Sequence, residues 1–144
     1  MTELPMRPPL EGVLETSLYV SDLEVSQRFY SDVFGFSSLY CDPRMAAMNV
    51  SDRHVLLLFL QGASSQSIEV AGAGIIPGHD GRGQLHLAFA ISTEDLARWR
   101  AWLTNRSIPV EAEMGWERGG RSLYLRDPDG HLLELVTPGV WAIR

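Results

Sequence analysis

The stretch RSLYLRDPDGHLLELVTP, residues 121–138, predicts two apolar strands joined by a tight turn. The turn is the DPDG segment, in which Gly130 can adopt the positive φ that such turns require. In the second strand, alternation places Leu132, Glu134 and Val136 on one face, so a carboxylate shares that face with apolar neighbours. A buried carboxylate needs a partner. The stretch therefore predicts a β-hairpin and, elsewhere in the chain, a partner for Glu134.

The bulk composition is that of an ordinary globular chain. Its 144 residues, 45% hydrophobic and 21% charged, suffice for one compact domain or two small modules with a shared core. The longest apolar run, residues 55–60, is too short to cross a bilayer, and residues 1–12 lack the apolar centre of a signal peptide. A single cysteine, Cys41, excludes an internal disulfide. We therefore expect a cytoplasmic protein without a membrane partner.

Nucleic acid is not an expected partner. The formal net charge is −6, and the basic residues are scattered rather than gathered into a stripe that would displace counterions from phosphates. The net charge instead indicates solubility.

The chain reads as one βαβββ unit written twice. In each copy an alternating strand precedes a capped helix with apolar residues at helical spacing, and three short strands follow. The first copy predicts a strand over 13–20, a helix over 21–35, and strands near 36–42, 44–50 and 54–60. The second predicts a strand over 84–91, a helix capped by Ser92 or Thr93, and strands near 108–114, 120–126 and 131–136.

This repeat predicts one fused α+β domain. Its parts are a first module over 13–62, a linker over 63–83, a second module over 84–137 and a C-terminal tail over 138–144. The linker is rich in Gly, Ser and Ala and is interpreted as a flexible connection or mobile loop.

Aligning the two copies brings polar residues to equivalent positions. Alignment by the helix starts pairs Glu15 with His86, and alignment of the last strands pairs Leu57 with Glu134. Three of these four inward positions carry side chains that can bind a metal. No pattern indicates that the remaining three histidines bind a metal. Two of them follow turns and alternate with the inward positions of their strands, so they are expected at the surface, and the third lies in the linker. They are His54, His131 and His79.

The stretches YVSDLEVSQRFYSDVFGF (19–36), HLAFAIS (86–92) and GGRSLYLRDPDGHLLELVTP (119–138) closely resemble the vicinal oxygen chelate superfamily. That group includes glyoxalase I, extradiol dioxygenases, fosfomycin-resistance enzymes and bleomycin-binding proteins. The resemblance implies two βαβββ modules that form a curved, mostly antiparallel sheet with a concave metal and substrate cavity. It also implies a small substrate that chelates the metal through vicinal oxygens, and a homodimer.

The resemblance further implies the metal ligands Glu15, His86 and Glu134. His86 and Glu134 match the superfamily's ligand positions as they stand, whereas Glu15 stands where the superfamily usually has His. Oxygen ligands bind hard divalent ions, so the expected cofactor is a divalent metal such as Fe, Mn, Zn or Ni. Simpler interpretations remain: Glu134 pairs with Arg126 or Arg121, or His86 is a core histidine bonded to a backbone carbonyl.

Ser122 and Tyr124 lie two residues apart in the strand before the DPDG turn, so they share a face. In the fosfomycin-resistance enzymes, which the SLY segment resembles, that face lines the substrate pocket. The resemblance therefore implies that both residues bind substrate. The alternative is a tyrosine at a sheet edge. No catalytic residue is assigned.

Within the superfamily, the segments HLAFAIS and GGRSLYLRDPDGHLLEL look most like the extradiol dioxygenases, so this metal-dependent activity is predicted first. Its iron triad has two His and one carboxylate, and Glu15 departs from it. The alternatives are a glyoxalase-like lyase or isomerase, and a fosfomycin-type resistance transferase or hydrolase.

A second class of function is a metal-free small-molecule binding protein of the bleomycin-resistance type. Leu57, with Ala47 and Phe59 nearby, would give such a protein an apolar half-pocket in the first module. The sequence leaves open whether the two modules of one chain pair with each other or with those of a second chain.

Overall fold

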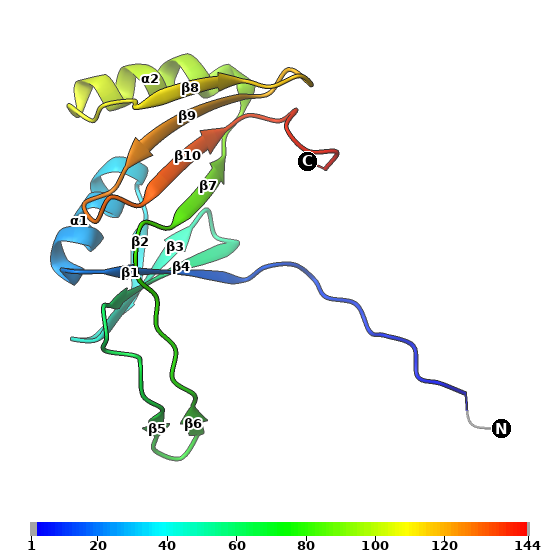
Figure 1. Ribbon diagram of the computed structural model, residues 1–144, viewed down its shortest axis with the longest axis vertical. Helices are drawn as coiled ribbons and strands as arrows, with labels where there is room; N and C mark the ends of the chain where they lie inside the picture. The colour runs from blue at the N-terminus through cyan, green and yellow to red at the C-terminus, as the bar shows by residue number, and fades with distance from the viewer. Residues whose placement is uncertain (1–2, 144) are drawn as a thin grey trace.

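Two βαβββ units follow each other along the chain (Figure 1). The computed structural model describes residues 3–143. The first unit comprises β1 (Glu15–Val20), α1 (Leu23–Phe34), β2 (Ser37–Cys41), β3 (Met45–Val50) and β4 (His54–Leu60). The second comprises β7 (His86–Ala90), a 3-10 turn (Thr93–Asp95), α2 (Leu96–Asn105), β8 (Ala112–Gly115), β9 (Arg121–Arg126) and β10 (Leu132–Val136). The predicted α+β class and the repeat are confirmed.

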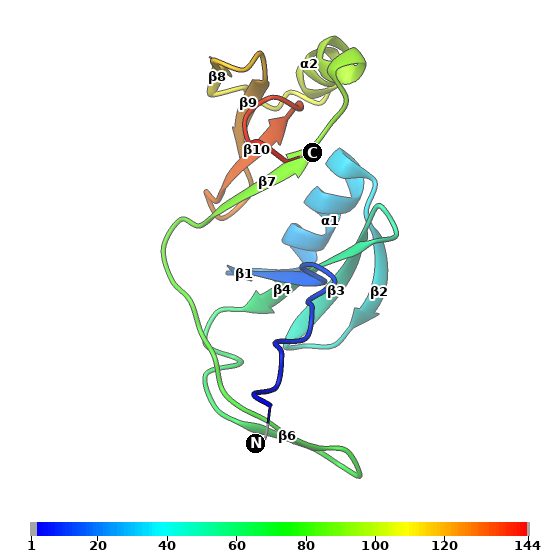
Figure 2. The same ribbon diagram turned by 90° about the vertical axis from the view of Figure 1, so that its right-hand side faces the viewer.

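Each unit forms its own four-stranded mixed sheet. The strand orders are β1-β4-β3-β2 and β7-β10-β9-β8, and in each sheet only the first pair is parallel. Within residues 3–143 no hydrogen-bonded ladder joins the two sheets. The strands β1 and β7 are therefore edge strands with one side unpaired. Helix α1 lies between the two sheets (Figure 2).

Helix α1, Leu23–Phe34, lies within the predicted range of 21–35. The Asp22 side chain accepts a hydrogen bond from the Val25 N–H at 3.1 Å, and Gly35 ends the helix in the left-handed region with φ 73°. The buried face of α1 carries Tyr30 and Val33. Side chains of both modules contribute to one core, which includes Leu18, Val20, Tyr30, Val33, Met48, Leu56, Leu58, Leu103, Leu123, Leu125, Leu133 and Leu135.

The DPDG turn does more than reverse the chain. Asp127 accepts hydrogen bonds from the buried Tyr30 hydroxyl at 2.7 Å and from the His131 N–H at 2.9 Å. Asp129 accepts one from the Ser21 N–H at 2.8 Å, at the start of α1. The turn of the second module therefore holds the helix of the first, which fixes the two modules relative to each other.

The expectation of a surface position for His131 is wrong. His131 is 1% exposed; its Nδ1 accepts from the Leu85 N–H at 2.9 Å, and its Nε2 donates to the Tyr19 carbonyl at 2.7 Å. The residue precedes β10, so strand alternation does not govern its direction. It connects β1 of the first module to the chain that enters β7. His54 is half-buried.

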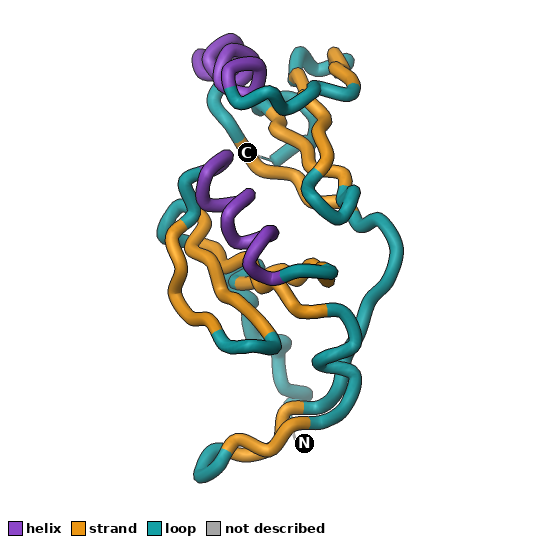
Figure 3. The backbone as a smooth tube through the Cα atoms, turned by 90° about the vertical axis from the view of Figure 1, so that its left-hand side faces the viewer, coloured by secondary structure: helices purple, strands orange, loops and turns teal. Residues whose placement is uncertain are grey.

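The linker is not a featureless loop. It contains a hairpin of β5 (Ile68–Val70) and β6 (Gly74–Ile76), which projects away from both sheets (Figures 1 and 3). On its return, the His79 N–H donates to the Ser64 carbonyl at 2.8 Å, and the His79 Nδ1 lies 2.7 Å from the Tyr19 hydroxyl. No helix among the described residues is long and apolar enough to span a membrane.

Candidate metal and substrate site

The neighbouring strands β7 and β10 bring His86 and Glu134 together. In their parallel register His86 lies beside Leu132, and Glu134 lies beside Ala88, so both polar side chains project from the same face of the sheet. His86 Nε2 is 3.2 Å from Glu134 Oε1. The carboxylate is buried, and the imidazole is about half exposed.

A backbone carbonyl fixes the orientation of the His86 ring. Its Nδ1 lies 2.8 Å from the Leu132 carbonyl oxygen, which can only accept a hydrogen bond, so Nδ1 carries the proton. In the neutral ring, Nε2 then directs a lone pair towards the Glu134 carboxylate. The lone pairs of His86 Nε2 and Glu134 Oε1, 3.2 Å apart, repel each other unless a proton or a cation lies between the two atoms. Metal-binding histidines are held through the other nitrogen in this way, so the pair fits a divalent cation.

The second carboxylate oxygen of Glu134 is held by a chain of donors. The Ser122 hydroxyl donates to Glu134 Oε2 at 2.5 Å, and the Trp116 indole N–H donates to the Ser122 oxygen at 2.8 Å. Ser122 is 1% exposed. Its hydroxyl is thus committed to the carboxylate. Trp116 was not identified from the sequence, because it comes from the β8–β9 hairpin, whose register no motif reveals.

Tyr124 lies directly opposite Glu134 in the β9–β10 ladder and shares its face. The ring centroids of Tyr124 and His86 are 6.4 Å apart. Burial, followed by the negative charge of Glu134, raises the pKa of the Tyr124 hydroxyl. The hydroxyl is therefore a neutral hydrogen-bond donor at physiological pH, next to the His86–Glu134 pair.

The arginines considered as partners of Glu134 bind other acids. Arg126 pairs with Glu111 at 3.1 Å, and Arg121 lies 3.6 Å from Glu113. Glu134 instead faces His86 and Ser122, which answers why an acid interrupts an apolar strand.

Glu15 lies apart from this pair. It is exposed at the start of β1, in the other sheet. Among residues 3–143 no three His, Cys, Asp or Glu side chains lie together in a group that could hold one metal ion. One chain therefore brings together two of the three predicted ligands, His86 and Glu134.

The family sequence model of the Glyoxalase/Bleomycin resistance protein/Dioxygenase superfamily matches residues 12–135 of this chain. The chain belongs to this superfamily. The match spans both βαβββ modules of this superfamily member and includes Glu15, His86 and Glu134.

Relatives at 31% identity include a transferase and a lyase. Metallothiol transferase FosB from Bacillus licheniformis is 31% identical over 131 residues, covering 90% of this chain and 77% of the relative. The crystal structure of lactoylglutathione lyase from Agrobacterium tumefaciens superposes with a TM-score of 0.84 at 31% identity, covering 94% of this chain and 100% of that one. Fosfomycin resistance protein FosX from Mesorhizobium loti, at 24% identity and a TM-score of 0.61, shows the shared fold.

These relatives favour the transferase and lyase alternatives over the extradiol dioxygenase that the sequence motifs predicted first. The superfamily prediction itself is confirmed. The choice among its reactions needed relatives of known activity, because the shared motifs specify the fold and its hairpins more than the chemistry.

Proposed function

We propose that the protein is a divalent-metal-dependent transferase or lyase that acts on a small substrate with adjacent oxygens, together with a low-molecular-weight thiol. The observation that carries this proposal is the arrangement of His86 Nε2 and Glu134 Oε1, 3.2 Å apart, with Nδ1 of the ring bound to a carbonyl. The names of the transferase and lyase relatives support the thiol chemistry.

In this proposal, residues of the chain bind the metal, position a ligand and contact the substrate. His86 and Glu134 hold the cation, which when bound supplies Lewis-acid polarisation of the substrate oxygens. Ser122 and Trp116 position Glu134 through its second oxygen. Tyr124, kept protonated by its raised pKa, donates a hydrogen bond to a substrate oxygen on the same face.

The third ligand in this proposal is Glu15 of the partner subunit in a homodimer. Both β1, which carries Glu15, and β7, which carries His86, are unpaired along one edge. A two-fold dimer is an economical way to cover two such edges, because the same contact occurs twice. With β1 of the partner subunit beside β7, its Glu15 would supply the third ligand to the His86–Glu134 pair.

Metal content and thiol consumption test the proposal together. Purified protein is incubated with Fe, Mn, Zn or Ni and then assayed with a panel of thiols against a phosphonate epoxide and an α-ketoaldehyde. We expect metal uptake and metal-dependent thiol turnover, both abolished by His86→Ala and retained by His54→Ala. A native protein that takes up none of the four metals would overturn the enzyme proposal and leave the metal-free binding protein.

A further inference from the structure

The N-terminal segment, residues 3–12, hereafter the arm, extends from β1 into solvent (Figure 1). Its large apolar side chains contact almost nothing: Leu4, Met6 and Leu10 are 90%, 92% and 95% exposed. Single exposed apolar residues are ordinary, but three on one short extended segment are typical of a segment that binds another surface.

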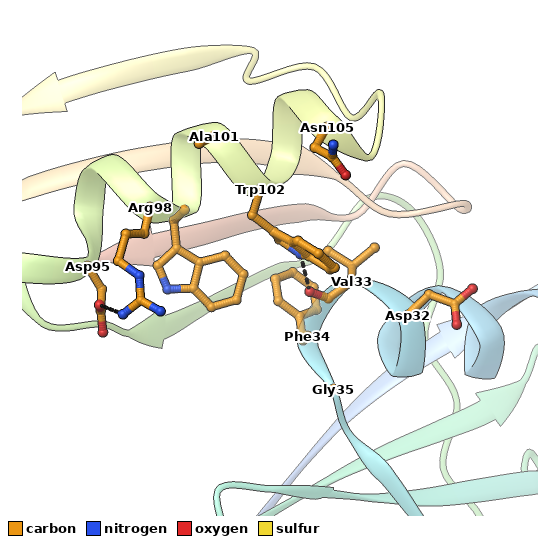
Figure 4. Close-up of a pocket in the computed structure, with 10 residues that line it drawn as sticks. Asp32, Val33, Phe34, Gly35, Asp95, Arg98, Ala101, Trp102 and Asn105 are labelled. Carbon is orange, nitrogen blue, oxygen red and sulfur yellow. Dashed lines mark hydrogen bonds and ion pairs between the residues drawn. The ribbon is translucent and has the colours of Figure 1, made fainter.

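An apolar groove of suitable size lies between the end of α1 and one face of α2 (Figure 4). Its volume is about 870 Å³, and its walls include Phe34, Trp99 and Trp102. The Trp102 indole N–H donates to the Val33 carbonyl at 2.9 Å, which fixes the ring across the groove. A second cleft of about 730 Å³ shares Phe34 and Trp99 with it, so the apolar surface continues towards β7.

Arm and groove match in shape and chemistry. The arm contains Pro5, Pro8 and Pro9, which favour the extended polyproline conformation, and such segments dock in grooves lined by aromatic side chains. Fully extended, the arm reaches roughly 35 Å. At the rim, the Asp32 side chain is about half exposed and lies 3.6 Å from Arg106, so it is accessible to Arg7 of the arm.

We propose that the arm of one chain lies in the α1–α2 groove of a second copy. In Figures 1 and 2 the arm leaves its own chain in the direction away from α2, so it does not point towards its own groove. The proposal goes beyond the metal site and does not depend on it, because neither the arm nor the groove contains a proposed ligand.

A peptide experiment tests the groove. The full-length chain with serine in place of Leu4, Met6 and Leu10 is titrated with a peptide of residues 3–12, which contains no tryptophan, and tryptophan emission is followed. We expect saturable binding with a blue shift as Trp99 and Trp102 lose water. A peptide with serine in place of Leu4, Met6 and Leu10 should not bind. Ala101→Arg, exposed in the groove, should abolish binding, whereas Ala97→Arg, exposed on the same helix outside the groove, should not.

Sedimentation identifies the chain that supplies the arm. Replacing Leu4, Met6 and Leu10 by serine in the full-length chain should raise the dissociation constant of the dimer more than about tenfold, equivalent to about 1.4 kcal/mol. Circular dichroism confirms that the variant is folded. Absence of peptide binding, or equal binding to the Ala101→Arg variant, would overturn the docking. An unchanged dissociation constant together with peptide binding would place the arm in its own groove and overturn the exchange between copies.

Discussion

His86 Nε2 and Glu134 Oε1 lie 3.2 Å apart, although in the neutral ring neither atom carries a proton. The Leu132 carbonyl holds the ring proton on Nδ1, and the Ser122 hydroxyl occupies the other oxygen of the carboxylate. These two hydrogen bonds hold His86 Nε2 and Glu134 Oε1 in positions where they face each other. Fixed ligands of this kind lose little freedom when a cation binds between them.

Glu134→Gln is expected to abolish divalent metal binding and to leave the fold intact. The amide removes the ligand charge, but its oxygen still accepts the hydrogen bond from Ser122. Metal stoichiometry after incubation, with circular dichroism as the check on folding, measures the effect. Glu111→Gln is the matched control, since Glu111 pairs with Arg126 at the surface. Native metal stoichiometry in Glu134→Gln would contradict the site.

Ser122→Ala is expected to lower metal affinity about 10- to 100-fold, because Glu134 loses the hydroxyl that orients it. The Trp116 indole N–H also loses its acceptor, at a cost of about 1–3 kcal/mol in the free energy of unfolding. Metal titration and urea denaturation measure the two effects separately. A variant with native metal affinity but weaker substrate binding would instead make Ser122 a substrate contact.

Local rules explain why the fold was predictable from particular residues. The Asp22 cap, the Gly35 terminus and the DPDG turn each act within a few residues, and hydrophobic periodicity supplies the strands between them. The repeat then singled out His86, at the position equivalent to Glu15, and Glu134, at the position equivalent to Leu57. Long-range packing was not predictable: His131 is buried because Tyr19, 112 residues away in sequence, offers it a carbonyl.

The same limit applies to the site. Trp116 reaches Ser122 across the β8–β9 hairpin, and the strand β8 begins at Ala112, later than the predicted start near 108. Its register depends on pairing with β9 and not on a local pattern. Neither this donor nor the separation of Glu15 from the pair was visible in the spacing of the repeat.

Tyr30→Phe is expected to destabilise the protein at neutral pH by about 1–3 kcal/mol, because the buried Asp127 loses a hydrogen-bond donor. Burial, and then the charge of Asp127, raise the pKa of Tyr30 far above its ordinary value. The folded state therefore binds this proton more tightly than the unfolded chain.

The raised pKa of Tyr30 in the folded state also predicts how the stability of Tyr30→Phe depends on pH. The contribution of Tyr30 is fully present below the unfolded pKa of about 10 and is lost as the pH rises above it. Denaturation at pH 7 and pH 11 should show a smaller alkaline loss in Tyr30→Phe than in the native chain. Tyr40→Phe, at an exposed tyrosine whose pKa is raised mainly by its hydrogen bond to Asp42, should reduce the alkaline loss less than Tyr30→Phe does. Equal losses in the native chain and Tyr30→Phe would contradict the assignment.

Mixing two inactive chains tests whether Glu15 completes the site of a second copy. Glu15→Gln and Glu134→Gln should each fail to bind metal alone, because every site then lacks one carboxylate. In a mixed dimer with exchanged ligands, one site contains both substitutions and the other contains neither. After co-refolding in equal amounts, half of the dimers are mixed, so about a quarter of the native metal stoichiometry should return. If Glu15 belonged to the site of its own chain, every site in the mixture would keep one defect and no metal would return. Normal metal binding by Glu15→Gln alone would remove Glu15 from the ligand set, while His86 and Glu134 would remain tested by their own variants.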